Sequence, residues 1–350
     1  MIFPFSYYLL TVPFTIVWKI LSTIRKQKQV VFYCDCYLDY VIFENVKIYL
    51  PEIKIVAKNK QLKKELASHG IPSRLWPVFP DAVIMTRHAF HKFPCKKIIK
   101  LGINHGAYHF KNFIRAEKYN AFEIFLFTSE YEVQEAKDFG ITCAQSGGFP
   151  KLDSFWFADT NDKLEQLKDK LNFNNNKPTI LFTATWDASG MSAVDKWYDK
   201  LGELSNEFNI MVSLHSFTSE KYVSAIKNTK GIVFIEDPKN YLYLKLADLM
   251  IGDTSSIIAE YCTLDKPMIT FSVKESKRLT PAIVTLIRDV SFQIDDYSKL
   301  KETIQYALKH PDEKSDLRQK YNKIMFDELD GKHGEKAASK MLAVLNKKLN

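Results

Sequence analysis

The chain reads LMIGDTSSIIAEYC between Leu249 and Cys262, and this stretch decides the fold. An apolar run long enough for a buried strand comes first, a turn of Asp, Thr and two Ser follows, and an apolar helical pattern comes last. A strand that leads through a polar turn into a helix is part of a βαβ unit, from which parallel sheets are built. The stretch therefore predicts an α/β protein.

The same alternation extends in both directions along the chain. In the second half it predicts strands at residues 179–183, 210–214, 232–235, 249–251 and 268–271, and helices at 193–207, 219–228, 256–262 and 297–308. In the first half it predicts strands at residues 30–33, 53–57, 82–85, 98–103 and 124–128, and helices at 61–68 and 130–139. Two Rossmann-like domains in series are the architecture that this pattern favours.

Turn-forming and helical compositions set the domain limits. A loose, Asn-rich segment at residues 153–177 predicts the interdomain linker, and residues 311–350, with a break at Asp330-Gly331, predict closing helices. The two domains then cover residues 29–152 and 178–310. With 350 residues, 46% hydrophobic and 26% charged, the chain is long enough for two buried cores and is not a disordered protein.

Charge and cysteine content limit the partners and the compartment. The first 115 residues hold 18 Lys and Arg against 6 Asp and Glu, which indicates an anionic partner: a membrane surface, a nucleic acid or a phosphorylated substrate. No nucleic-acid-binding motif is found, so we expect no nucleic acid. The five cysteines are odd in number and favour a reducing, cytoplasmic compartment. Cys34 and Cys36 are too close for a zinc knuckle, so we expect no metal.

Residues 1–28 form a segment of their own. Met1–Trp18 carries no charge and is rich in aromatic residues, and Lys19, Arg25, Lys26 and Lys28 follow. This order is wrong for a secretory signal, and the two prolines disfavour a spanning helix. The pattern predicts an interfacial anchor on an anionic membrane. The alternative is an ordinary helix packed on the body.

Candidate functional residues lie in the loops after predicted strands, where ligands bind in open α/β sheets. Thr254, Ser255 and Ser256 would present hydroxyls and backbone N–H groups to an anion, and Glu260 would accept hydrogen bonds from ribose hydroxyls. The alternative is a plain helix N-cap on Thr254 or Ser255.

Two histidines occupy similar loops. His105, before Gly106, could take a proton from an attacking hydroxyl, or it could be a structural histidine. His109 or Lys111 could hold an anionic substrate, and His215 with Ser216 could donate to a phosphate oxygen. The Gly-rich motifs of ATPases, GTPases and dinucleotide enzymes are missing, which excludes those classes.

Taken in order, these loops resemble the CDP-glycerol glycerophosphotransferase family of teichoic-acid and capsule biosynthesis. The resemblance rests on six short motifs between about residues 100 and 335: Asn104-His105-Gly106-Ala107 with Lys111, residues 148–153 (GFPKLD), residues 183–187 (TATWD), residues 214–216 (LHS), residues 253–256 (DTSS) with Asp265-Lys266-Pro267, and Asp330-Gly331-Lys332. The sequence departs from the family pattern at Ala107-Tyr108 and at Ser216, which replace a Thr-Pro and a Pro.

The resemblance implies a GT-B fold, with two Rossmann-like domains facing a central cleft, the acceptor on the first and the CDP donor on the second, and no metal or other cofactor. His105 and His215 become the catalytic residues, as general base and as donor to the transferred phosphate. The donor would be bound by Thr183, Thr185, Ser216, Thr254, Ser255, Ser256 and Glu260, and the acceptor by His109 and Lys111.

The activity that the resemblance implies is transfer of glycerol phosphate, or a related alditol phosphate, from a CDP-activated donor to a hydroxyl of a lipid-linked or polymeric glycan, with release of CMP. Such an enzyme would be attached peripherally to the inner face of the cell membrane. The alternatives are a GT-B glycosyltransferase or epimerase acting on a nucleotide sugar, and a noncatalytic membrane-surface scaffold.

Overall fold

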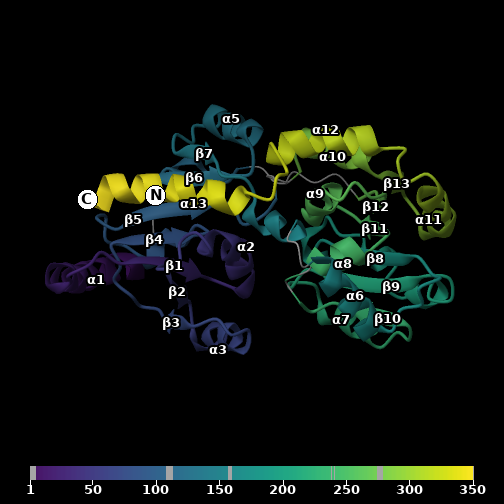
Figure 1. Ribbon diagram of the computed structural model, residues 1–350, viewed down its shortest axis with the longest axis horizontal. Helices are drawn as coiled ribbons and strands as arrows, with labels where there is room; N and C mark the ends of the chain where they lie inside the picture. The colour runs from purple at the N-terminus through teal and green to yellow at the C-terminus, as the bar shows by residue number, and fades with distance from the viewer. Residues whose placement is uncertain are drawn as a thin grey trace. The chain divides into compact units, whose positions relative to one another are not determined.

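The structure, a computed structural model, describes residues 5–107, 113–156, 160–237, 239, 241–273 and 279–349. It comprises two compact units (Figure 1). Most of the first unit is formed by residues up to Gly106 and by Phe113–Asp153, and the chain returns to it from Asp330 onward. The second unit is formed mainly by Ser154–Leu329. The domain limits predicted from the sequence remain a proposal.

The first unit is built on a seven-stranded sheet in which every pair of neighbours is parallel. The strand order is β3-β2-β1-β4-β5-β6-β7, so the order reverses between β1 and β4. The strands are β1 (Val30–Cys34), β2 (Lys54–Ala57), β3 (Ser73–Leu75), β4 (Ala82–Met85), β5 (Ile99–Ile103), β6 (Ile124–Phe127) and β7 (Ala144–Ser146).

The second unit contains a six-stranded parallel sheet in the order β10-β9-β8-β11-β12-β13. Its strands are β8 (Thr179–Ala184), β9 (Asn209–Leu214), β10 (Ile232–Phe234), β11 (Leu249–Gly252), β12 (Met268–Phe271) and β13 (Phe292–Ile294). This is the strand order of a Rossmann-like sheet, and it reverses between β8 and β11. The predicted α/β class with two such sheets is confirmed.

Helices cover both sheets (Figure 1). Those of the first unit are α1 (Phe5–Ile24), α2 (Tyr37–Lys47), α3 (Lys60–Ser68), α4 (Ala116–Tyr119), α5 (Glu130–Asp138) and α13 (His333–Leu349). Those of the second are α6 (Thr160–Leu171), α7 (Glu220–Lys227), α8 (Tyr241–Leu246), α9 (Ile257–Cys262), α10 (Pro281–Val290), α11 (Leu300–Lys309) and α12 (Ser315–Phe326).

Strand β1 shows why these apolar runs form central strands. Val31 and Tyr33 face one core, which also includes Phe14 of α1. Phe32 points to the other side, where its ring stacks on Phe43 of α2 with 3.9 Å between centroids. A parallel strand with helices on both faces must be apolar throughout, and the sequence of β1 satisfies that requirement.

Two predictions about local structure are wrong. Residues 193–207 were expected to form one helix but contain short 3₁₀ turns at Val194–Lys196 and Leu201–Glu203. Their buried apolar residues come in pairs three apart, a spacing that suits 3₁₀ turns as well as an α-helix, and Gly202 disfavours the longer helix. The segment expected to be loose, residues 153–177, contains α6.

The C-terminal helix α13 completes the first unit by packing on α2 and β6. Its first residues dock on the 148–153 turn: Asp153 accepts the backbone N–H groups of His333 at 3.1 Å and Gly334 at 2.6 Å. Gly148 adopts φ +71°, and a Cβ there would lie 2.5 Å from the His333 ring. The 148–153 motif is therefore in direct contact with the residues that immediately follow the motif Asp330-Gly331-Lys332.

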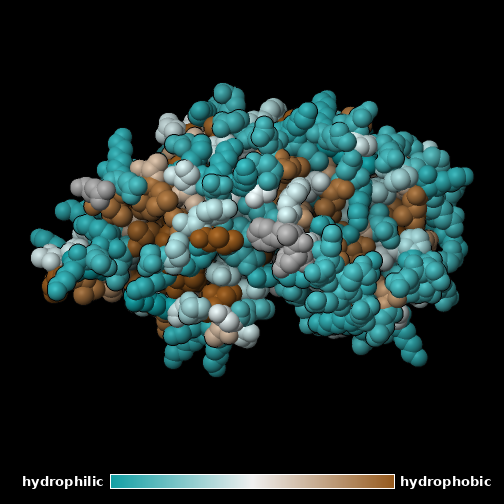
Figure 2. Space-filling model, viewed as in Figure 1, coloured by the Kyte–Doolittle hydropathy of each residue, from teal (hydrophilic) through white to brown (hydrophobic). Residues whose placement is uncertain are grey.

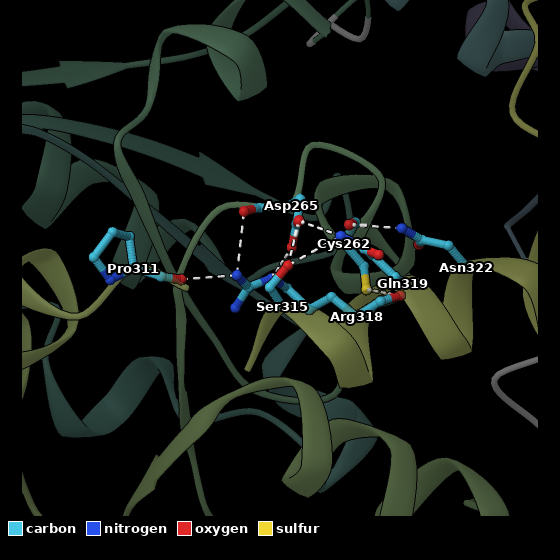
Figure 3. Close-up of polar contacts among 7 residues, drawn as sticks. All are labelled: Cys262, Asp265, Pro311, Ser315, Arg318, Gln319 and Asn322. Atoms are coloured by element: carbon cyan, nitrogen blue, oxygen red, sulfur yellow. Dashed lines mark hydrogen bonds and ion pairs between the residues drawn. The ribbon is translucent and has the colours of Figure 1, made fainter. Parts of the chain in front are cut away.

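In the second unit, Arg318 of α12 fixes the end of α9 (Figure 3). The Arg318 side chain is fully buried, and its Nε donates to the carboxylate of Asp265 at 2.7 Å. Its Nη2 donates to the carbonyls of Asp265 and Pro311, and Asn322 donates to the carbonyl of Cys262. These bonds hold the C-terminal end of α9 in place, while the loop before α9 carries predicted site residues.

Helix α1 has two different faces. Phe14 is buried, the Trp18 indole donates to the carbonyl of Pro80 at 2.7 Å, and Arg25 pairs with Asp81 at 2.7 Å. The opposite face exposes Val12, Ile16, Ile20 and Ile24, which follow one another at four-residue intervals, and Val17 and Leu21 are less exposed. Apolar side chains are visible over α1 at the left of Figure 2. The alternative expectation, a helix packed on the body, thus describes one face of α1, and membrane attachment stays a prediction.

Candidate active site

The loops after β8 and β11 are joined at the point where the order of the second sheet reverses. Asp253 is almost fully buried. Its carboxylate accepts hydrogen bonds from the backbone and hydroxyl of Thr185, at 2.9 to 3.1 Å, and from the N–H of Ala193 at 3.0 Å. The Thr254 hydroxyl lies 3.2 Å from that of Thr185 and donates to the carbonyl of Met191. Asp253 therefore shapes the loops from within.

The predicted donor-binding residues lie around this junction. Thr183 is buried on β8, and Ser255 and Ser256 are half-buried in the loop that leads into α9. The N-cap of α9 is Ser256, which makes no side-chain capping bond, and not Thr254 or Ser255, the residues of the capping alternative. Glu260 lies on α9 with 7% of its surface exposed. The structure thus brings Thr183, Thr185 and Thr254 to one end of the sheet.

His215 lies at the same end of the second sheet, directly after β9. The backbone N–H of Phe217 donates to its Nδ1 at 3.1 Å. A ring that accepts at Nδ1 carries its proton on Nε2 when neutral, so Nε2 can donate to an oxygen. His215 and Ser216 are exposed, and Trp186 and Phe217 surround the imidazole with ring centroids 6.4 and 5.1 Å away. The geometry suits a hydrogen-bond donor to an anion.

His105 follows β5 in the first unit and is exposed to solvent. It is preceded by the buried Asn104, whose backbone N–H donates to the carbonyl of Leu126 at 2.9 Å. The loop therefore leaves the sheet from a fixed position and presents the imidazole outward. His109 and Lys111, predicted to bind the acceptor, lie outside the described residues.

Sequence reasoning missed a polar cluster at the β1/β4 reversal of the first sheet. The buried carboxylate of Asp39 accepts from the Thr86 hydroxyl at 2.6 Å and from Nε of Arg87 at 2.9 Å. Its other oxygen accepts the N–H of Asp35, and Arg87 also contacts the sulfur of Cys36. About a third of the Arg87 side chain is exposed, so the guanidinium can meet an anion. Both loops follow predicted strands, which was the available signal.

Cavities and metal sites add no further candidate at these loops. Two cavities of about 480 and 560 Å³ lie at the opposite end of the second sheet, where both are lined by Lys177, Asp248 and Lys266. Within the described ranges, no three His, Cys, Asp or Glu side chains are grouped to hold a metal ion.

Comparisons with known proteins identify the family. The family model for CDP-Glycerol:Poly(glycerophosphate) glycerophosphotransferase matches residues 100–342. The chain belongs to this family. The match spans His105, His215 and the β8/β11 junction, and it confirms the resemblance drawn from the six motifs.

Relatives with curated names come from Bacillus. The teichoic acid poly(glycerol phosphate) polymerase of Bacillus spizizenii is 24% identical over 165 residues, which cover 43% of this chain and 39% of the relative. The teichoic acid poly(ribitol-phosphate) polymerase of the same organism is 23% identical over 231 residues, covering 59% of this chain and 35% of the relative. The chain thus spans less than two-fifths of the length of these relatives.

Solved structures agree on the fold. A structure of the wall teichoic acid polymerase TagF matches over 100% of both chains with a TM-score of 0.68 and 13% identity. The UDP-GlcNAc 2-epimerase of Neisseria meningitidis matches over 92% of this chain and 100% of its own, with a TM-score of 0.59 and 14% identity. At these identities the likeness establishes the GT-B-like fold alone.

Proposed function

We propose that this protein transfers glycerol phosphate, or a related alditol phosphate, from a CDP-activated donor to a hydroxyl of a polymeric or lipid-linked glycan in teichoic-acid synthesis. The observation that carries the proposal is the family match, which covers both histidine loops and the β8/β11 junction. Relatives are named as polymerases of poly(glycerol phosphate) and of poly(ribitol-phosphate), so the proposal includes both alditol phosphates.

In the proposed reaction, an acceptor hydroxyl attacks the distal phosphorus of the CDP-alditol. The oxygen–phosphorus bond of the new phosphodiester forms, the bond from that phosphorus to the bridging oxygen breaks, and CMP leaves. The exposed imidazole of His105 takes the hydroxyl proton. His215, which carries its proton on Nε2 when neutral because Nδ1 accepts from Phe217, stabilises the negative charge on the transferred phosphate.

The donor would lie at the β8/β11 reversal, the usual ligand position of this sheet type. Thr183, Ser216, Ser255 and Ser256 offer hydroxyl donors for its phosphates. The hydroxyls of Thr185 and Thr254 already donate to Asp253 and to the carbonyl of Met191, so these two residues would shape the donor site. Glu260 would accept hydrogen bonds from the ribose. The acceptor would be bound by the predicted His109 and Lys111. In the first unit, the partly exposed guanidinium of Arg87 offers a further cation for an anionic acceptor.

Attachment to an anionic membrane is part of this proposal. The exposed face of α1 offers apolar side chains at four-residue intervals from Val12 to Ile24. Lys19, Lys26 and Lys28, all exposed, lie along or just after the helix. Cations at an anionic surface contribute about 1 kcal/mol each, and the apolar face adds burial that salt does not screen. Of the helices that the structure describes, none has the length and apolarity needed to cross a bilayer.

The test is release of CMP from CDP-glycerol and CDP-ribitol in the presence of a glycan acceptor. We expect His105→Ala to lower kcat by about 10² to 10⁴ fold with nearly unchanged affinity for CMP, because a base for the acceptor acts in the transition state. Loss of CMP binding with retained turnover would contradict the acceptor-side role. Release of UDP from UDP-sugars, or their epimerisation, would favour the nucleotide-sugar alternative, and no nucleotide binding would favour a scaffold.

A further inference from the structure

We propose that Glu132 is a positioning residue for His105, and that it acts by holding Asn104 at the base of the His105 loop. The inference rests on the proposed role of His105 as the base. Glu132 belongs to α5, 27 positions further along the chain, and was not among the residues selected from the sequence.

The contact between Glu132 and the His105 loop is direct. Oε1 of Glu132 accepts a hydrogen bond from the side-chain amide of Asn104 at 3.2 Å, and both residues are buried. Asn104 comes immediately before His105 and is also tied to β6 through its backbone N–H. Movement of the Asn104 side chain would therefore move the residue that carries the imidazole.

The other oxygen of Glu132 is fixed by the loop after β6. Oε2 accepts the backbone N–H of Thr128 at 2.9 Å and its hydroxyl at 2.8 Å. The N–H of Glu132 in turn donates to the hydroxyl of Ser129, which caps α5. One carboxylate thus connects two neighbouring strand-end loops, and the start of α5 holds that carboxylate in place.

Burying an acidic side chain at this position costs free energy, so a residue that only filled space here would be expected to be apolar. A fully buried carboxylate loses its hydration, and burial raises the pKa of Glu132 to about 7 although hydrogen bonds from Thr128 and Asn104 oppose the rise. Nearby Glu135 raises it further, and Tyr119 is the other titratable group affected by the charge. An ionised carboxylate only accepts hydrogen bonds, so it selects the orientation of Asn104 in which the NH₂ group faces it.

The decisive variant is Glu132→Gln, which keeps the shape of the side chain but replaces one acceptor with a donor. Glu130→Gln, at an exposed position in the same helix turn, is the matched control. We expect Glu132→Gln to lower kcat by about 10- to 100-fold, because small displacements of a catalytic group have effects of that size, and to change the KM for the CDP-alditol by less than about twofold. The control should match the wild type.

Hydrogen exchange of the backbone amides of residues 104–106 provides a readout that does not depend on activity. We expect faster exchange in Glu132→Gln than in the wild type and in Glu130→Gln. Asn104→Ser removes the amide donor and leaves the bonds from Thr128 intact, so it serves if Glu132→Gln fails to fold. Its effect on kcat and that of Glu132→Gln should be non-additive in the double variant.

The outcomes separate this inference from the proposed function. If His105→Ala loses turnover while Glu132→Gln and Asn104→Ser keep both kcat and the wild-type exchange rates, the positioning role is wrong and the function stands. A loss of thermal stability with unchanged kcat would also overturn it. If the wild-type chain releases no CMP, the proposed function fails, and unchanged exchange at residues 104–106 would independently refute the coupling of Glu132 to the loop.

Discussion

Glu132 links the stability of the first unit to pH. Its pKa is about 7 in the folded protein and about 4.3 for an unfolded Glu, so between these values the folded state binds the extra proton. The free energy of unfolding that Glu132 contributes is therefore fully present below about pH 4 and is lost as the pH rises through 7. In urea unfolding at pH 5 to 8, the wild type should lose up to about 1.4 kcal/mol per pH unit relative to Glu132→Gln. If the free energies of unfolding of the two proteins changed in parallel with pH, Glu132 would not be the titrating group.

A comparison of alanine variants at Gly148 and Gly190 distinguishes the cost of backbone strain from the cost of steric overlap. Both have positive φ, +71° and +72°, but a Cβ at Gly148 would meet the His333 ring at 2.5 Å, whereas a Cβ at Gly190 meets nothing within 4 Å. We expect Gly190→Ala to cost about 1–2 kcal/mol from backbone strain alone. Gly148→Ala should cost about 1–3 kcal/mol more, because α13 must shift. Denaturant unfolding measures both, and equal losses would mean that His333 moves aside freely.

At the scale of elements, Asp253 joins β8, β11 and the segment around Ala193. Asp253→Asn places an NH₂ group opposite N–H donors, so at least one hydrogen bond is lost in a buried position. We expect a loss of about 1–3 kcal/mol in unfolding free energy and weaker binding of CMP in calorimetric titration. Asp296→Asn, at an exposed cap, is the control. Wild-type CMP affinity in Asp253→Asn would place the nucleotide away from this junction.

Elements differ in how far their sequence predicts them. Strands such as Ile124–Phe127 and Met268–Phe271 were predicted to within a residue, because a parallel strand with two covered faces is a short, wholly apolar run. Helix α2, Tyr37–Lys47, was missed, since it buries so much of its surface that little amphipathic contrast remains. Strand Phe292–Ile294 was missed because three residues carry too weak a pattern.

Site residues follow the same logic. The loop rule predicted that His105, His215 and Thr254 follow strands, and the structure has each of them directly after or within two residues of a strand, although their roles are proposals. Glu132 and the pair of Asp39 with Arg87 escaped notice because their contacts join loops whose adjacency depends on strand order. That order places β4 beside β1, and neither periodicity nor composition reveals it.

At the scale of the whole molecule, the two faces of α1 determine how membrane attachment must be tested. Deletion of residues 1–28 would remove Phe14 and Trp18 from the core, so Ile16→Ser with Ile20→Ser is the sharper change. We expect this double variant to bind anionic vesicles less tightly than the wild type. Its remaining binding should weaken as salt is added, because salt screens interactions between charges beyond about 10 Å. Val284→Ser, an exposed apolar position of the second unit, is the control. Unchanged sedimentation with vesicles would exclude α1 as the anchor.

Because the chain returns to the first unit at its C-terminal end, the two units complete their folding in a particular order during synthesis on the ribosome. Asp153 emerges 180 residues before its partner His333. At roughly 5–20 residues per second, that gap lasts about 10 to 40 s. Meanwhile residues 154–329 supply most of the second unit, whereas the first still lacks α13 on α2 and β6. The second unit can therefore reach its native state first. Until α13 is synthesised, the first unit exposes the apolar surface that α13 later covers, which is the kind of surface that chaperones bind.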